Sequence, residues 1–383
     1  MQKQSELDLR IQNLLEQSFL KPYLEDEDIT DISYDGEIMR LQHNKKGRYK
    51  TDFQPTDEDV LSLGKKIADI QGKEFNNSRP ILDTELAYFR VNFIHHAVSP
   101  SGCTFAVRVS KPRLAAQNIN EMIKDVQEVD LKEDVAKLLE VLIKADMNTI
   151  ISGRTGAGKT ELQKLLVGFI PNNKKITLIE DTMDSHIKAL YPEKDINSWR
   201  TLTDETRDNK IGYNDLIQAG LRNNPDWLIM AETRGSEAYD MVEAALTDHN
   251  LISTIHVKRA KAIPSRLLTM IGQKYQVNEL LFGKDIVSVL PIGIYLTIKE
   301  TENGIERFIR EIVEFTDFTE KGAEYITLYA IERDFNEEIG DYEDKVITNP
   351  LSDETLANIK YEGLYHMLPV RFKKSGNEQK GRN

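Results

Sequence analysis

The stretch Ile150-Ile151-Ser152-Gly153-Arg154-Thr155-Gly156-Ala157-Gly158-Lys159-Thr160 decides the fold. It fits the pattern G-x-x-x-x-G-K-[ST], with a strand-like apolar run before it and a helix-compatible run after it. Glycines let the backbone curl until successive N–H groups point at one anion, and the following helix adds the positive end of its dipole. We therefore expect residues 153–160 to cradle phosphates, with Lys159 on the outer phosphates and the Thr160 hydroxyl on Mg²⁺.

Acidic residues follow two apolar strand-like runs further along the chain. Residues 176–179 lead into Glu180 and Asp181, and residues 227–231 lead into Glu232. Ligand sites of open α/β sheets lie at the carboxyl ends of strands, and hydrolysis of a nucleotide needs a carboxylate near the metal and a group that orients water. A single acid after a strand is more often a solvated turn residue, but two of them in one nucleotide domain favour catalytic roles.

Two histidines flank a fourth apolar run, residues 251–255: His249 before it and His256 directly after it. A histidine after a parallel strand could sense the γ-phosphate, or it could be a hydrogen-bonded structural residue, and the spacing leaves both open. No further His or Cys stands nearby at metal-ligand spacing, so this pair does not predict a metal centre.

Composition restricts the class of protein. The chain has 383 residues, of which 40% are hydrophobic and 30% are charged, with a net charge of −13. This length predicts two domains, and the acidic balance excludes a generally basic surface for nucleic acid. A single cysteine, Cys103, excludes an internal disulfide and suits a reducing compartment.

Membrane insertion is not predicted. No apolar run approaches the roughly 20 residues of a membrane-spanning helix, and the segment MQKQSELDLR is polar and acidic where a signal peptide would be basic and then apolar. We expect a cytoplasmic protein that reaches a membrane only through partners.

The pattern of apolar residues along the sequence predicts an α/β protein with two domains. Short alternating runs indicate a small α+β domain with a mainly antiparallel sheet over residues 1–115, followed by a polar linker at 116–130. Strands then alternate with helices in a nucleotide domain at 131–320, which predicts a mostly parallel sheet with helices on its faces.

The last part of the chain carries two further expectations. Residues 286–313 look rich in strands, and the charged stretch 321–383 is predicted to be an extension that ends in a frayed tail from Phe372 to Asn383.

Together these blocks resemble the secretion (traffic) ATPases of type II and type IV secretion, conjugation and pilus assembly. The resemblance is strongest to the branch shared by conjugative type IV secretion and Flp/Tad pilus systems. The blocks that carry it are, in order, YLEDEDITDISYDG, RPILDTELAYFRVNF, CTFAVRV, GRTGAGKT, IEDTMD, NNPDWLIMAETRGSEA and TDHNLISTIH. The resemblance implies a RecA-like P-loop domain preceded by the small α+β domain.

The family pattern also assigns roles to residues. It implies that Lys159 and Thr160 bind phosphate and Mg²⁺, that Glu180 of the Asp box positions the attacking water, and that Glu232 acts at the γ-phosphate and at the metal, directly or through water. Asp181 belongs to the same Asp box.

The family pattern also has histidine and arginine positions that this sequence matches. His249 and His256 match the two positions of the family's His box. Arg90 and Arg108 match arginines that members direct at the nucleotide from the N-terminal domain. The remaining matches are the arginines that flank the Walker B strand, Arg222 and Arg234.

The resemblance further implies a homohexamer that hydrolyses ATP with Mg²⁺. Such a motor would drive a secretion, conjugation or pilus machine through inner-membrane partners, without stable nucleic-acid binding of its own, and a conjugative type IV system is the favoured machine. Two alternatives remain. One is a nucleic-acid translocase or helicase with a related core, which the net charge and the lack of aromatics clustered with arginines disfavour. The other is a scaffold that binds ATP without hydrolysis, because Ala231 stands where the family usually has glycine. Asp248 is a separate departure, since it replaces the usual glycine beside the first histidine.

Overall fold

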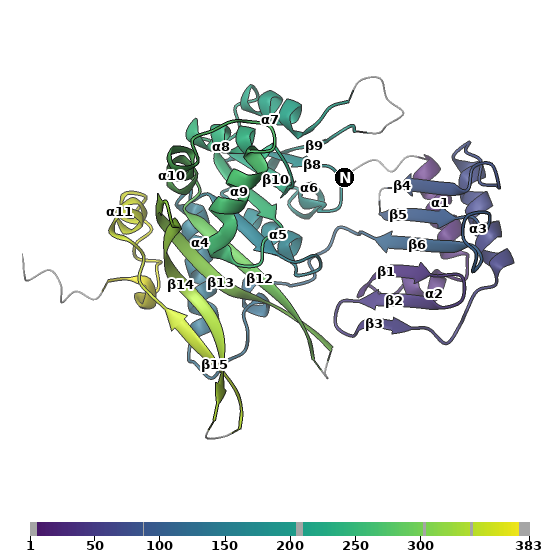
Figure 1. Cartoon of the computed structure of the whole chain (residues 1–383), viewed down its shortest axis with the longest axis horizontal. Coiled ribbons are helices and arrows are strands. Elements are labelled where there is room, and N and C mark those ends of the chain that lie inside the picture. The colour runs from purple at the N-terminus through teal and green to yellow at the C-terminus, as the bar shows by residue number, and fades with distance from the viewer. Residues whose placement is uncertain (1–5, 87, 204–209, 302–303, 338–339, 375–383) are drawn as a thin grey trace, which may run out of the picture. The chain divides into compact units, whose positions relative to one another are not determined.

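The computed structural model describes residues 6–86, 88–203, 210–301, 304–337 and 340–374 (Figure 1). The chain forms two compact units. Unit 1 comprises Met1–Ala115 together with Lys299–Glu306, and unit 2 comprises Ala116–Ile298 together with Arg307–Asn383. None of the helices in these described ranges is long and apolar enough to cross a membrane.

Unit 1 is built on a six-stranded sheet in the order β3-β2-β1-β6-β5-β4. The pairs along it are antiparallel, as the alternating sequence predicts. The strands are β1 (Ile29–Tyr34), β2 (Met39–His43), β3 (Gly47–Lys50), β4 (Ile81–Glu85), β5 (Phe89–Ile94) and β6 (Thr104–Val109). The helices are α1 (Glu6–Glu16), α2 (Lys21–Leu24) and α3 (Asp57–Ile70).

Helices cover one face of this sheet and leave the other polar. Ile11 and Leu15 of α1 are buried in a core cluster with Phe89 and Val91 of β5. Because side chains alternate along a strand, Arg90 between these two lies on the opposite, exposed face. Unit 1 therefore presents an open sheet face that carries Arg48, Arg90 and Arg108.

Unit 2 contains a nine-stranded sheet in the order β15-β14-β13-β12-β7-β11-β10-β8-β9. The six strands from β12 to β9 in this order pair in parallel, and β13, β14 and β15 continue the sheet with antiparallel pairs at β13–β14 and β14–β15. The strands are β7 (Thr149–Gly153), β8 (Lys175–Glu180), β9 (Asp195–Arg200), β10 (Trp227–Thr233), β11 (Asn250–Ile255), β12 (Ile292–Thr301), β13 (Gly304–Thr319), β14 (Gly322–Asn336) and β15 (Asp341–Thr348).

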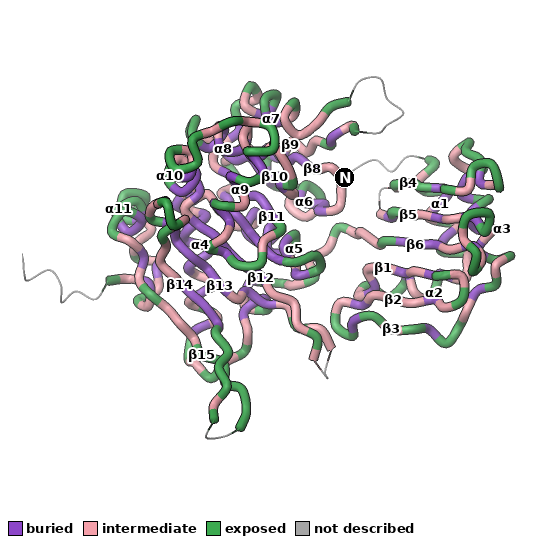
Figure 2. The backbone as a smooth tube through the Cα atoms, in the orientation of Figure 1, coloured by how far each residue is buried: buried purple, intermediate pink, exposed green. Residues whose placement is uncertain are grey.

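Helices connect and cover the parallel strands. They are α4 (Leu131–Lys144), α5 (Lys159–Phe169), α6 (Ile187–Leu190), α7 (Tyr213–Leu221), α8 (Ala238–Leu246), α9 (Ile263–Ile271), α10 (Glu279–Val289) and α11 (Asp353–Tyr361). Three short 3₁₀ turns add η1 (Ile119–Met122), η2 (Ala260–Ala262) and η3 (Val370–Phe372). Figure 2 shows the central strands as the buried interior of the unit. Strands covered on both faces are apolar without alternation, which is why the runs at β7, β8, β10 and β11 were readable from sequence.

The strand-rich reading of residues 286–313 is wrong at its start. Ile286–Val289 form the last turn of α10, and β12 begins only at Ile292. Ile286 and Val287 are buried in the core of unit 2. A short apolar run does not distinguish a buried helical turn from a strand, and here the helix is set by Asn278, whose side chain caps the helix by accepting the N–H groups of Leu280 and Leu281.

Segments expected to be peripheral contribute to unit 2. In residues 116–130, the η1 turn buries Ile119 and Met122. Residues 321–383 supply β14, β15 and α11, and the buried carboxylate of Glu314 anchors the start of α11 by accepting hydrogen bonds from the Ser352 N–H at 2.9 Å and the Thr355 hydroxyl at 2.6 Å.

The chain is held to the core as far as Phe372, where a frayed tail was expected to begin. Phe372 is fully buried, and its carbonyl accepts the N–H of Leu351 at 3.1 Å. Arg371 donates from Nε to Asp134 at 3.0 Å and also pairs with Glu128. Residues 375–383 of the expected tail lie outside the described residues.

This anchor gives a stability prediction. Phe372→Ala leaves a cavity under η3 and should lower the free energy of unfolding by about 3–5 kcal/mol, measured by urea unfolding of the full chain. Val370→Ala is the matched control two residues away, because Val370 is 82% exposed and should change stability by less than about 0.5 kcal/mol. Equal effects of the two substitutions would contradict the anchoring of the C-terminal segment.

Candidate functional site

The loop between β7 and α5 has a backbone that requires glycine. Gly156 and Gly158 have φ angles of +77° and +94°, in the region where a side chain is strained. A Cβ on Gly153 would lie 2.8 Å from the carbonyl oxygen of Leu296 on the neighbouring β12. The glycines of the motif are therefore fixed by the curl of the loop and by its close packing on β12.

Lys159 is the first residue of α5, and its side chain folds back over the loop. Its Nζ donates to the carbonyls of Gly153 at 3.2 Å and Arg154 at 3.4 Å. Burial lowers the pKa of Lys159, and the charge of Arg234 lowers it further, while Glu232 opposes the shift. The result is a partly desolvated cation inside the glycine loop, where a phosphate would neutralise it.

Glu232 lies near the carboxyl end of β10 and is mostly buried. Its Oε2 accepts from Arg234 at 2.8 Å, and the same guanidinium binds Asp181 at 2.7 Å. Burial raises the pKa of Glu232, but the bond to Arg234 and the charges of Arg234, His256 and Lys159 outweigh it, so the net shift is downward. Glu232 is therefore a permanent anion beside the loop.

His256, directly after β11, links the loop to this carboxylate. Its Nδ1 lies 3.4 Å from Lys159 Nζ, and its Nε2 lies 2.8 Å from Glu232 Oε1 without hydrogen-bond geometry. Because an ammonium group can only donate, a hydrogen bond between these two nitrogens requires Nδ1 to be the acceptor. Burial and then Lys159 lower the pKa of His256, so the ring is neutral at pH 7.

Glu180 ends β8 and is 1% exposed. One oxygen, Oε1, accepts the N–H of Ser185 at 3.1 Å, whereas Oε2 has no hydrogen-bond partner among the described residues. Burial, with smaller contributions from Asp184 and Asp181, raises the pKa of Glu180 to about 7. A carboxyl group of this kind exchanges a proton near neutral pH, and one of its oxygens remains available to a ligand or a water.

Sheet order explains why these residues meet. β7, β11, β10 and β8 are consecutive and parallel, so Gly153, His256, Glu232 and Glu180 stand at one edge of the sheet. The register between β10 and β11 shifts between Met230 and Thr233, and such an irregularity re-aims side chains.

Two predicted residues are not brought to this edge. His249 precedes β11 and contacts the Thr247 hydroxyl at 3.3 Å. With the six residues of β11 between them, His249 and His256 lie roughly 20 Å apart along the strand. Arg222 follows α7 before the start of β10 and is exposed, so it also lies at the opposite edge. Within this chain the structure does not place either residue beside the glycine loop.

Sequence reasoning missed two residues that support the loop. Arg307 on β13 donates from Nε to the carbonyl of Gly156 at 2.7 Å, and Gln163 on α5 donates to the carbonyl of Met230 at 2.8 Å. Gln163 lies four residues after Lys159, on the buried face of α5. A polar residue at such a position of the sequence could have been recognised as a candidate for a buried hydrogen bond. Arg307 is 151 residues away from Gly156 in sequence, and only the pairing of the sheet brings it there.

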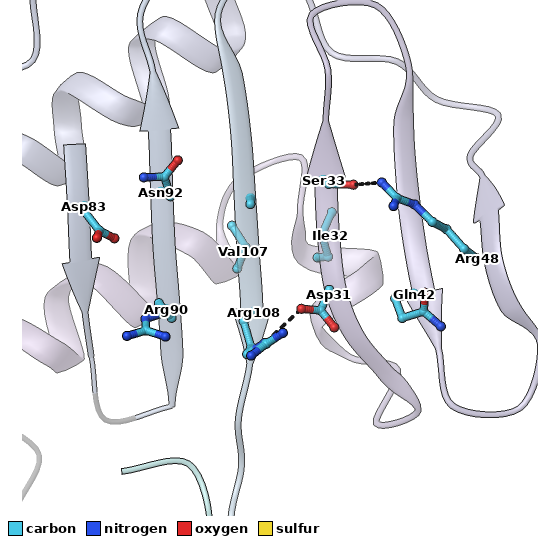
Figure 3. Close-up of a pocket in the computed structure, with 11 residues that line it drawn as sticks. Asp31, Ile32, Ser33, Gln42, Arg48, Asp83, Arg90, Asn92, Val107 and Arg108 are labelled. Carbon is cyan, nitrogen blue, oxygen red and sulfur yellow. Dashed lines mark hydrogen bonds and ion pairs between the residues drawn. The ribbon is translucent and has the colours of Figure 1, made fainter. Parts of the chain in front are cut away.

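Arg90 and Arg108 belong to unit 1, where they line a cavity of about 640 Å³ on the open sheet face (Figure 3). Arg108 Nε binds Asp31 at 3.0 Å, and Arg48 donates to the Ser33 hydroxyl at 3.1 Å. Arg90 and Arg108 are register partners on β5 and β6, an arrangement that sets two positive charges opposite each other.

The sequence of this chain matches a known protein family. Residues 84–288, more than half of the chain, match the model of the type II/IV secretion system protein family. The chain belongs to this family. The resemblance drawn from the sequence blocks is thereby confirmed.

Relatives of this secretion family member include an uncharacterised protein from Bacillus anthracis, 32% identical over 307 residues, covering 78% of this chain and 67% of the relative. The type IV secretion system protein VirB11 from Brucella suis is 24% identical over 316 residues, covering 75% of this chain and 84% of VirB11. The X-ray structure of the ATPase DotB from Legionella pneumophila aligns with a TM-score of 0.55 at 18% identity, covering 87% of this chain and 82% of DotB. The likeness to DotB shows that the two chains share an α/β fold with a mostly parallel sheet.

The family implies ATP and Mg²⁺, and the residues at the sheet edge fit both. The glycine loop and the helix N-terminus behind it match a phosphate. Lys159 supplies a buried cation that donates directly to the loop carbonyls of Gly153 and Arg154. The buried oxygens Glu180 Oε2 and Glu232 Oε1 lack hydrogen-bond partners among the described residues, and such carboxylate oxygens are ligands for a hydrated hard cation.

The raised pKa of Glu180 gives a stability prediction. Because the folded chain holds this proton more tightly than the unfolded chain, stability falls as pH rises from about 4.5 to about 7. Glu180→Gln removes the buried charge and should stabilise unit 2 by about 3 kcal/mol at pH 8 and by less than about 1 kcal/mol at pH 5.

The measurement is urea unfolding at the two pH values, and the decisive quantity is the difference between them. The exposed Glu354→Gln serves as the control and should show no such pH dependence. A Glu180→Gln effect that is the same at pH 5 and pH 8 would mean that the carboxyl group is solvated and ordinary.

Proposed function

We propose that this chain is an ATP hydrolase that uses Mg²⁺ and powers a type IV secretion or conjugation machine, or a related pilus assembly. It works as a homohexamer on the cytoplasmic side of the membrane, attached through inner-membrane components of that machine. The observation that carries the proposal is the convergence of the glycine loop with Glu180 and Glu232 at one edge of the unit 2 sheet.

Phosphate binding falls to the loop and the first residues of α5. The N–H groups of residues 153–160 and Lys159 bind the β- and γ-phosphates, and Lys159 gains a counter-charge for its desolvated ammonium group. The Thr160 hydroxyl and Glu232, the latter directly or through water, hold Mg²⁺. When bound, Mg²⁺ neutralises charge on the phosphate oxygens.

Glu180 is the residue that positions the attacking water. Its free oxygen accepts a hydrogen bond from that water, and its pKa of about 7 allows it to accept a proton at neutral pH. Ser185 fixes the other oxygen, so the carboxyl group cannot rotate away from the site. Asp181 and Arg234 act one step further out, where they hold Glu232 in place.

His256 connects the phosphate to the strand ends. It sits between Lys159 and Glu232, so any rearrangement of Lys159 after loss of the γ-phosphate also changes the field at Glu232. We assign His256 to sensing and relay and not to proton abstraction, because its neutral ring faces a cation on one side and an anion on the other.

Arg90 and Arg108 are assigned to the triphosphate by their chemistry. Two guanidinium groups at paired positions repel each other, and an anion with several oxygens relieves that repulsion. Asp31 offsets the charge of Arg108 in the present structure, and a nucleotide would compete for the same guanidinium. His249 and Arg222 remain proposed site residues only through the family pattern, and a neighbouring subunit of the hexamer is where they would act.

The relatives support the machine at a coarse level. VirB11 from Brucella suis and PtlH from Bordetella pertussis are both named type IV secretion system proteins. The lean towards a conjugative system rests on the N-terminal sequence blocks. Genes next to this one, encoding a coupling protein and relaxase or prepilins and a prepilin peptidase, would separate the two kinds of machine.

Hydrolysis and binding should separate in variants of the site. Lys159→Ala should lose nucleotide binding and turnover together, whereas Glu180→Gln and Glu232→Gln should keep binding and lose about a hundredfold or more in phosphate release. Binding is measured with a fluorescent ATP analogue, and turnover by steady-state phosphate release. Glu354→Gln on α11 is the matched acidic control and should behave as the parent chain.

Other outcomes identify the alternatives. Near-parental turnover in both Lys159→Ala and Glu232→Gln would place hydrolysis elsewhere. Tight ATP binding by the parent chain with no phosphate release would identify a scaffold. Stimulation by single-stranded DNA that disappears with salt would identify a translocase.

Turnover should also depend on the protonation of Glu180. At saturating Mg²⁺ and ATP, kcat should rise about tenfold per pH unit below pH 7 and level off above it, because only the carboxylate form of Glu180, whose pKa is about 7, can accept the proton. Residual activity of Glu180→Gln should lack this inflection. An identical inflection in Glu180→Gln would assign the titration to another group.

A further inference from the structure

Unit 1 contains a second cluster of chemically active side chains, which the proposed ATPase does not use. Asp57 is the first residue of α3, His96 follows β5, and Cys103 directly precedes β6. His96 Nδ1 lies 3.1 Å from Asp57 Oδ2 and 3.6 Å from Cys103 Sγ. The carboxylate oxygen, the ring nitrogen and the sulfur all lie within 4.8 Å of one another.

These separations match the edges of a metal tetrahedron. With Zn–S near 2.3 Å and Zn–N near 2.1 Å, a tetrahedral angle places the two donor atoms about 3.6 Å apart, and a nitrogen and an oxygen donor about 3.3 Å apart. The observed 3.6 Å and 3.1 Å are close to both values. Little movement would be needed for the three atoms to share one ion.

The surrounding backbone holds the carboxylate in position. The N–H of Cys103 donates to Asp57 Oδ1, which leaves Oδ2 on the side of His96. Gly102 makes this approach possible, since its φ is +112° and a Cβ there would lie 2.9 Å from Asp57 Oδ1. A hydrogen bond to the second oxygen of a ligating carboxylate is the usual support of a metal site.

The neighbouring His95 supports His96 and is not a fourth ligand in this arrangement. Its Nδ1 accepts the N–H of Ala97 at 3.1 Å, and its buried ring lies 4.1 Å from the ring of His96. Phe75 packs edge-on against His95 with the ring centres 5.4 Å apart. The orientation of His96 is thus fixed by packing on one side and by Asp57 on the other.

Solvent reaches two of the three donors. The side chains of Asp57 and His96 are each 45% exposed, while Cys103 is buried beneath them. An ion can therefore enter between Asp57 and His96 and meet the sulfur below, with its fourth position left to water. Burial raises the pKa of Cys103, so without metal this residue is a thiol, and binding an ion would release its proton.

We propose that Asp57, His96 and Cys103 form a site for one Zn²⁺ ion per chain, with water as the fourth ligand. Thiolate, imidazole and carboxylate together suit zinc better than Mg²⁺ or Ca²⁺, which take oxygen donors. The ion would join the start of α3 to the β5–β6 connection. This inference does not depend on ATP hydrolysis, because every residue that carries it lies in unit 1 and outside the glycine-loop site.

The test uses Co²⁺ as a spectroscopic substitute for zinc in the chelator-treated full chain. Because Cys103 is the single cysteine, a near-ultraviolet thiolate-to-cobalt charge-transfer band reports this site alone, and cobalt bound with nucleotide at the glycine loop does not produce it. We expect the band to saturate at one Co²⁺ per chain, to show the visible intensity of tetrahedral cobalt, and to vanish when Zn²⁺ is added.

Variants separate the three ligands. Cys103→Ala should abolish the band, and Asp57→Asn and His96→Asn should weaken Co²⁺ binding at least about tenfold. Asp57→Asn retains an oxygen for the Cys103 N–H, which protects the local fold. The control is His366→Ala, an exposed histidine of unit 2, which should bind Co²⁺ as the parent chain does.

Thermal unfolding distinguishes variants that have lost the metal site from variants that have lost the fold. Zn²⁺ should raise the Tm of the parent chain and of His366→Ala, but should leave the Tm of Cys103→Ser unchanged. Absence of the charge-transfer band in the folded, reduced parent chain would overturn the proposal, as would equal zinc stabilisation of the parent and Cys103→Ser. In that case the cluster is a hydrogen-bonded support for the start of α3.

Discussion

The parallel hydrogen bonding of β7, β11, β10 and β8 is the constraint on which the site depends. Lys159, Glu180, Glu232 and His256 are far apart in sequence. Glu180 and Glu232 lie at the carboxyl ends of β8 and β10, His256 directly follows β11, and Lys159 follows the loop after β7. Parallel pairing sets those ends level, so the loop cation, the neutral histidine and the two acids reach one edge. Buried bonds then fix the edge, including Thr254 to the Ala231 carbonyl at 2.7 Å and Gln163 to the Met230 carbonyl at 2.8 Å.

Burial gives the two acids different chemistry although both end strands of the same sheet. Glu232 has a guanidinium, an ammonium and an imidazole around it, so the pKa of this residue falls in spite of burial. Glu180 has hydrogen bonds from Ser185 but no cation that lowers its pKa, so burial dominates and the pKa rises to about 7. One carboxylate is thus suited to a permanent charge beside a cation and the other to proton exchange, a separation that acid–base sites commonly show.

Sequence reasoning succeeded where local chemistry and topology agree. The apolar runs that became β7, β8, β10 and β11 differ from the observed strands by at most two residues at either end, because strands buried on both faces are apolar along their whole length. The positions of Glu180 and Glu232 at the carboxyl ends of their strands were predictable for the same reason. The two histidines show the limit. Both match the His-box motif, but β11 separates them. Only His256 follows the carboxyl end of the strand, where the glycine loop lies.

The remaining misses have physical causes as well. Arg307 reaches Gly156 only through strand pairing across a long stretch of chain, and no local pattern marks it. β15 is an exposed edge strand whose charged side chains hide its alternation. Phe372 lies between Arg371 and Lys373 but has a fully buried ring, and composition does not reveal where one aromatic side chain packs. Asp248, in place of the family's usual glycine, has a φ of +68°, a conformation that aspartate tolerates better than most residues.

The register irregularity in β10 has a consequence for how this segment can vary. Side chains on a strand alternate, so inserting or deleting one residue between Trp227 and Glu232 would turn the acid towards the opposite layer of the unit. A glutamate at position 232 is therefore not sufficient. The number of residues from Trp227 to Glu232 must also stay the same, whereas the apolar residues between them can be exchanged for one another.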